Sequence, residues 1–92
     1  MIININDIVD IVKKIEKTES VTKYVTSYAL KHYVERMLAI KTNNQVSYIS
    51  NEEIIKAMDL AGFKCVPTYK DSVNCHFNLS RRSMLEVFKL VL

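Results

Sequence analysis

The segment of residues 49–63 carries signals for both ends of a helix, which constrains the fold more than any other part of the chain. Ser50 and Glu53 have the spacing of a capping box, in which each side chain binds the backbone N–H of the other residue. Gly62 provides the left-handed residue at which many helices end, and Phe63 can then pack back onto the helix. The sequence therefore predicts a short helix bounded by Ser50 and Gly62.

After Gly62 the apolar residues recur at every second position, a period that is typical of strands. Two such runs, residues 63–69 and 73–79, flank a polar turn. Pro67 has no N–H to donate, which places the first strand at a sheet edge. The second run alternates apolar with polar residues, namely Val73, Cys75, Phe77 and Leu79 with Asn74, His76 and Asn78. We expect a hairpin with one face on the core and the other in water.

Further helices are predicted toward the two ends of the chain. Asn6 can cap the first helix. Its apolar residues recur at helical spacing, and they are Ile5, Ile8, Val9, Val12 and Ile15. Ser80 can cap the last helix. The expected buried stripe of that helix consists of Met84, Leu85, Phe88 and Val91.

A long central helix is expected over Val21–Lys41, because residues 18–20 interrupt the apolar period and offer a cap, and no glycine or proline follows. Its apolar residues divide between two faces, with Val21, Tyr24, Val25 and Tyr28 on one and Leu30, Val34, Met37 and Leu38 on the other. Either the helix kinks near Ala29, or its two halves contact different elements. A second copy of the chain is one candidate for such an element, so a homodimer through Val21–Lys41 is one expectation.

A short additional strand can form at Val46–Tyr48. These elements predict the α+β class and a single domain over residues 1–92. The expected order is α-α-(β)-α-β-β-α, and the second half is similar to a winged helix.

Several classes of function are not expected from this sequence. The chain has one glycine, so it has no glycine-rich loop for a nucleotide. Cys65, Cys75 and His76 do not have the spacing of a zinc motif, and we expect both thiols to be reduced, core-facing small hydrophobes. His32 lies near Tyr28, Glu35 and Arg36 in sequence, but no nucleophile or second base accompanies them at a recognisable spacing. We therefore expect no enzymatic activity, no metal and no cofactor.

The formal net charge of +3 is only mildly basic. A helix, a glycine stop and a hairpin after two earlier helices are the parts of a DNA-binding winged helix. The helix after Ser50 carries Glu52, Glu53 and Asp59 against Lys56 alone, which disfavours contact with phosphates. If DNA is bound, the expected contacts are Lys64, Lys70, Arg81 and Arg82.

Some of these residues also form a pattern, Tyr48-Ile49-Ser50-Asn51-Glu52-Glu53, Ala57, Gly62-Phe63-Lys64 and Asn74-x-x-Phe77-Asn78-Leu79-Ser80. Over about residues 46–83 the chain thus resembles small accessory proteins of phages and mobile elements of Gram-positive bacteria. The resemblance implies a protein that occupies a host or phage protein, as anti-CRISPR and other anti-defence inhibitors do, or a transcriptional regulator. It carries no functional residues across.

The first residues carry acid before base, unlike a signal peptide, and no apolar run is long enough for a membrane span. We therefore expect a cytoplasmic protein without membrane contact. The expected partner surface combines the polar hairpin face with basic residues near the strand and helix ends, namely Lys64, Lys70, Asn74, His76, Asn78, Arg81 and Arg82. A solvated sheet face without a partner is the alternative.

Overall fold

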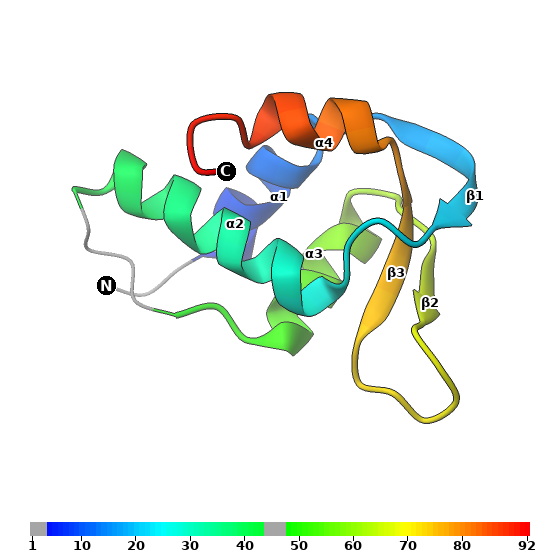
Figure 1. Cartoon of the computed structure of the whole chain (residues 1–92). Coiled ribbons are helices and arrows are strands. Elements are labelled where there is room, and N and C mark those ends of the chain that lie inside the picture. The colour runs from blue at the N-terminus through cyan, green and yellow to red at the C-terminus, as the bar shows by residue number, and fades with distance from the viewer. Residues whose placement is uncertain (1–3, 44–47) are drawn as a thin grey trace.

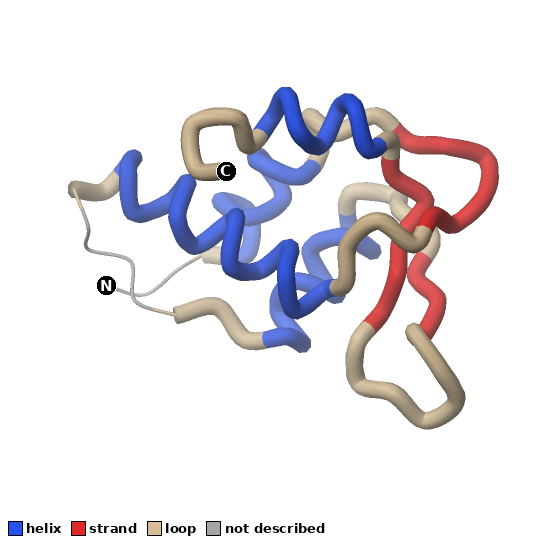
Figure 2. The backbone as a smooth tube through the Cα atoms, viewed as in Figure 1, coloured by secondary structure: helices blue, strands red, loops and turns tan. Residues whose placement is uncertain are grey.

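Four helices and a three-stranded antiparallel sheet make up residues 4–43 and 48–92, the part of the chain that the computed structural model describes. In chain order the elements are α1 (Ile5–Val12), β1 (Lys17–Thr22), α2 (Ser27–Lys41), α3 (Asn51–Leu60), β2 (Cys65–Pro67), β3 (Cys75–Leu79) and α4 (Arg81–Val87). The strands gather at one end of the molecule and the helices fill the rest (Figures 1 and 2). The predicted α+β class and the order of helices and hairpin are confirmed.

The core lies between the helices and one face of the sheet. Its fully buried large side chains are Phe77, Phe88, Ile8, Ile11, Ile15, Leu30, Ile49, Ile54, Met58, Leu79, Val12 and Val34. They come from α1, α2, α3 and β3 and from residues just outside α1, α3 and α4, so one continuous core joins both halves of the chain. No helix among the described residues is long and apolar enough to cross a membrane.

Both predicted ends of α3 are confirmed. The Ser50 hydroxyl accepts a hydrogen bond from the Glu53 N–H at 3.0 Å, and the Glu53 carboxylate accepts one from the Ser50 N–H at 3.0 Å. Gly62 has a φ of +90°, and the Phe63 N–H donates to the Met58 carbonyl at 3.0 Å. This is the bonding of a glycine-terminated helix, and Phe63 is buried against the core as expected.

The predicted start of the central helix is wrong. Residues Lys17–Thr22 form β1, and α2 begins at Ser27 behind an N-cap at Thr26, although its end at Lys41 is as predicted. β1 forms because β3 offers it an open edge, and because its β-branched residues Thr18, Val21 and Thr22 suit a strand better than a helix. The division of the apolar residues therefore needs no kink at Ala29, since most of the first group precedes the helix.

The structure also differs from the predictions at the cap of α1 and at Leu85, and its described residues do not show the suggested extra strand. Asn4, not Asn6, caps α1, because the Asn4 side chain accepts the Asn6 N–H at 2.9 Å and Asn6 lies inside the helix. Leu85 was assigned to the buried stripe of α4, but 39% of it is exposed. The suggested strand at Val46–Tyr48 falls mostly outside the described residues, and Tyr48 itself belongs to no strand.

The sheet has the order β1-β3-β2, which confirms that Pro67 lies on an edge strand. In the hairpin, Cys65 pairs with Phe77 and Pro67 with Cys75. β1 pairs with β3 only at Lys17 with Leu79 and at Thr22 with Phe77, so four residues of β1 face a single residue, Asn78, between these two points. β1 is therefore a strongly bulged edge strand.

Candidate binding surface at the start of α4

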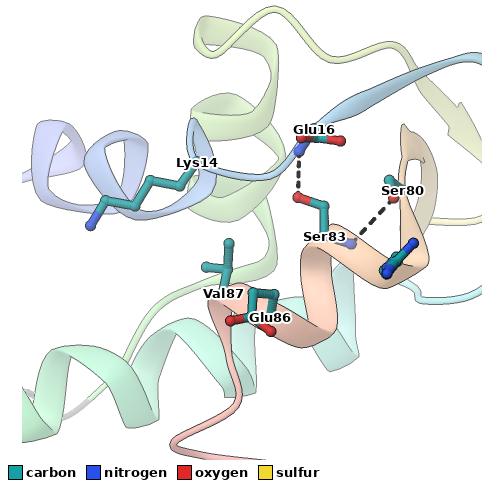
Figure 3. A pocket seen from close by; sticks show the side chains of 7 residues that line it. Lys14, Glu16, Ser80, Ser83, Glu86 and Val87 are labelled. Atoms are coloured by element: carbon teal, nitrogen blue, oxygen red, sulfur yellow. Dashed lines mark hydrogen bonds between the residues drawn. The ribbon is translucent and has the colours of Figure 1, made fainter.

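Two grooves meet where α4 begins. The first, with a volume of about 470 Å³, is lined by Thr18, Thr22, Tyr24, Ser80, Arg81, Arg82 and Leu85. The second, of about 600 Å³, is lined by Lys14, Glu16, Ser80, Arg82, Ser83, Glu86 and Val87 (Figure 3). Ser80 and Arg82 belong to both grooves, so this end of the molecule presents one continuous, hollowed surface.

Hydrogen bonds between distant segments hold this surface in place. The Ser80 hydroxyl caps α4 by accepting the Ser83 N–H, and the Ser83 hydroxyl accepts the Glu16 N–H at 2.8 Å (Figure 3). The Ser80 N–H in turn donates to the Glu16 carbonyl at 2.9 Å. These bonds join the connection between α1 and β1 to the first turn of α4, and they fix the backbone from which Arg81 and Arg82 project.

The first groove combines side-chain types that are frequent at protein interfaces. The Arg81 guanidinium carbon lies 5.7 Å from the centre of the Tyr24 ring. Tyr24 is 58% exposed, and Leu85 lies in the same groove. Tyrosine and arginine are enriched among residues that dominate binding energy, because a planar ring and a planar cation bury large area at low conformational cost. We call Tyr24, Arg81, Arg82 and Leu85 the α4 surface.

The basic residues expected to bind a partner do not all lie together. Arg81 and Arg82 are exposed and belong to the α4 surface. Lys64 is also exposed, but its ammonium donates to the Glu19 carbonyl at 3.0 Å and so holds the bulge of β1. Lys70 lies in the hairpin turn, at the opposite end of β3 from α4 (Figure 1).

The expected wet face of the hairpin is wrong for Asn78, which is only 4% exposed. Its amide nitrogen donates to the Thr18 carbonyl at 2.9 Å, and its oxygen accepts the Lys64 N–H at 2.6 Å. Both ends of the amide are therefore used inside the molecule, between β1 and the entry to β2.

His76 and Asn74 are half-buried, and they contact residues at or just before the start of α2. A ring nitrogen of His76 lies 3.1 Å from the Val25 carbonyl, and the Asn74 amide oxygen lies 3.5 Å from the Ser27 hydroxyl. The Ser27 hydroxyl also accepts the N–H of Cys75, the first residue of β3, at 3.1 Å. The polar residues of the hairpin thus hold β1 and the start of α2. The sequence did not reveal this arrangement, because over most of β1 it predicts only a break between two helices.

The two thiols are free and half-buried, not fully buried as expected. In the hairpin register they occupy diagonal rather than directly opposed positions, since Cys65 faces Phe77. Burial, assisted by the charges of Cys75 and Asp59, raises the pKa of Cys65 to about 11. Burial also raises the pKa of Cys75. Within residues 4–43 and 48–92 no three His, Cys, Asp or Glu residues are placed to hold a metal ion.

Sequence reasoning missed two members of the α4 surface, Tyr24 and Leu85, because both were assigned to apolar stripes of helices. The available signal for Tyr24 was Thr26, a good N-cap residue, which places Tyr24 before the helix. The five tyrosines of the chain differ in their surroundings. Tyr33 does pack on Phe88, with ring centres 5.6 Å apart, whereas the other four are largely exposed, namely Tyr24, Tyr28, Tyr48 and Tyr69.

Comparison of the chain with protein-family models, with curated proteins and with solved structures finds no match. Inference about function therefore depends on the chemistry of the surface itself.

Proposed function

We propose that this chain is a non-enzymatic binding domain of a phage or mobile element, which inhibits a host protein by occupying it through the α4 surface. The observation that carries the proposal is the exposed pairing of Tyr24 with Arg81 in a groove beside Leu85. An apolar and aromatic centre with basic residues around it is suited to a protein surface that offers acidic side chains. The resemblance of residues 46–83 to phage accessory proteins supports the inhibitory setting.

The residues that carry this resemblance have structural roles in the fold. Ser50 and Ser80 cap helices, Gly62 ends α3, and Asn78 joins three segments of backbone. A protein of this kind can therefore keep its framework residues while the exposed surface changes with the partner. This favours a binding module over an enzyme, whose reacting groups need fixed positions.

DNA binding is the alternative, and the order of α2, α3 and the β2–β3 hairpin favours it. In a winged helix α3 would enter the major groove. The exposed residues of α3 include Glu52 and Asp59 against Lys56 as the sole cation, so this helix would repel phosphates. We therefore rank protein binding first.

The test begins with affinity capture from host lysate using the wild-type protein, followed by affinity measurements on the captured protein. The double variant Arg81→Glu with Arg82→Glu should bind at least about tenfold more weakly, which corresponds to about 1.4 kcal/mol. A matched control, Lys41→Glu with Lys56→Glu, makes the same change of charge on exposed residues outside the two grooves and should bind like the wild type.

Two results would contradict the proposal. Unchanged affinity in a folded Arg81→Glu, Arg82→Glu variant would exclude the α4 surface as the contact. Tight binding to duplex DNA that weakens steeply with salt, without capture of any protein, would favour the regulator instead.

A further inference from the structure

Lys31, in the second turn of α2, is buried, with only 5% of its surface exposed. Its ammonium donates to the Ile49 carbonyl at 3.3 Å. The same ammonium lies 4.5 Å from the centre of the Tyr48 ring and 5.4 Å from that of Tyr28. Lys31 thus connects α2 to the residues that lead into α3.

This buried cation has no carboxylate partner. Among the described residues no ion pair includes Lys31, and the remaining seven residues, 1–3 and 44–47, contain no Asp or Glu. Glu35 is one turn further along α2, but one of its oxygens lies 3.1 Å from a ring nitrogen of His32 and the other accepts the Ile49 N–H at 2.8 Å. Buried lysines are almost always paired, because desolvation of the charge is costly.

The two rings beside Lys31 are largely exposed, Tyr28 at 56% and Tyr48 at 62%. A cation lying against two ring faces gains part of what it loses on leaving water. A partner that packed on these rings would remove more water from the ammonium, and the cost of doing so falls if the partner supplies a negative charge. The site therefore has aromatic walls and a positive charge between them.

We propose that Tyr28, Lys31 and Tyr48 form a second binding site, which takes an Asp or Glu side chain of a protein partner together with an apolar neighbour. The carboxylate pairs with the Lys31 ammonium, and the neighbour packs on the tyrosine rings. Lys31 is buried in the free protein, so the exposed Tyr48 ring must turn aside for the carboxylate to reach the ammonium, a motion that exposed side chains make within nanoseconds. The site shares no residue with the α4 surface, so it does not depend on the function proposed for that surface.

The test is an NMR titration of the full chain with two capped peptides that differ in one group. Ac-Leu-Glu-Phe-NH₂ carries the carboxylate, and Ac-Leu-Gln-Phe-NH₂ has nearly the same shape without it. Saturable shifts are expected at the ring protons of Tyr28 and Tyr48 and at the side chain of Lys31, with affinity for the Glu peptide about tenfold higher. Equal affinity for the two peptides, or no shift at these residues, would overturn the proposal.

Variants separate binding from a purely structural role of Lys31. Lys31→Met keeps the length and apolar stem of the side chain, and it should abolish the preference for the Glu peptide, while Lys56→Met on α3 should retain it. If Lys31→Met does not fold, Tyr28→Ser provides the second test, because loss of the ring that stays in place should weaken binding of the Glu peptide. A preference that survives Lys31→Met, or unchanged binding in Tyr28→Ser, would overturn the proposed site.

Discussion

Arg81 and Lys31 both lie against tyrosine rings, yet their surroundings differ. Arg81 is exposed in a groove beside Tyr24, whereas Lys31 is buried and also donates to the Ile49 carbonyl. An exposed cation can be exchanged with little effect on folding, because water screens it in the free protein. A buried cation holds backbone segments together as well as offering its charge, so the fold and any binding at that site are linked.

Replacement by Glu at Lys31 and at Arg81 should give the largest difference in the free energy of unfolding. Lys31→Glu should lower the free energy of unfolding by about 3 kcal/mol or more, since it buries an unpaired carboxylate beside a carbonyl and two electron-rich ring faces. Arg81→Glu should change it by no more than about 0.5 kcal/mol. Urea unfolding followed by circular dichroism measures both values. Similar losses in the two variants would contradict the distinction between an exposed and a buried cation.

Replacement of Asn78 should have the next largest effect on stability, because its amide positions the backbone beneath the first groove. Asn78→Ala should cost about 2 kcal/mol, since it leaves the Thr18 carbonyl and the Lys64 N–H without partners. Asn74→Ala removes one longer contact and should cost about 0.5 kcal/mol. If thermal melts show equal losses for the two variants, the amide of Asn78 does not hold β1.

Each site includes a residue that lies beside a helix cap, Tyr48 near Ser50 and Arg81 next to Ser80, and removal of each cap should loosen a different site. Ser50→Ala should cost about 1 kcal/mol and broaden the NMR signals of Tyr48 and Lys31. Ser80→Ala should cost a similar amount, about 1 kcal/mol, but broaden those of Tyr24 and Arg81. Broadening of both sets of signals in either variant would mean that the sites are not independent.

The smallest expected effect concerns the thiol of Cys65 in the β2–β3 hairpin, outside both sites. The raised pKa of Cys65 means that the folded protein retains the thiol proton after the unfolded chain has lost it. The free energy of unfolding should therefore fall as pH rises from 9.0 to about 11, and more in wild type than in Cys65→Ala. Chemical denaturation at several pH values measures the two slopes. Parallel slopes would indicate a hairpin that opens enough to hydrate the thiol.

The α3 helix and the hairpin could be predicted from sequence because their signals are local. A capping box, a glycine stop and a strand period act within a few residues of where they are read. β1 could not be predicted in this way, since its hydrogen-bonding partners on other segments lie 45 to 60 residues away. The sequence of β1 contains three β-branched residues, Thr18, Val21 and Thr22, but it lacks the alternation of apolar and polar residues that marks a strand.

The residues of the candidate sites show the same difference between local and long-range signals. Arg81 and Arg82 were identified because exposure is the expected state of arginine in the first turn of a capped helix. Lys31 was not, because its burial arises only when the segment at Tyr48 folds against α2. Asn78 was assigned to solvent because strand alternation does not reveal which element covers the polar face.

The pairing of β1 with a distant strand has a consequence for the order of folding. Closing a loop of about sixty residues costs more entropy than forming a helix or a hairpin, and contacts of such long range form slowly. β1 also meets β3 at only two positions, so it gains little until the hairpin and α4 are in place. The chain should therefore collapse around α1, α2, α3 and the hairpin first, with β1 docking last and detaching first. Native-state hydrogen exchange should find the amides of residues 17–22 the least protected of the sheet.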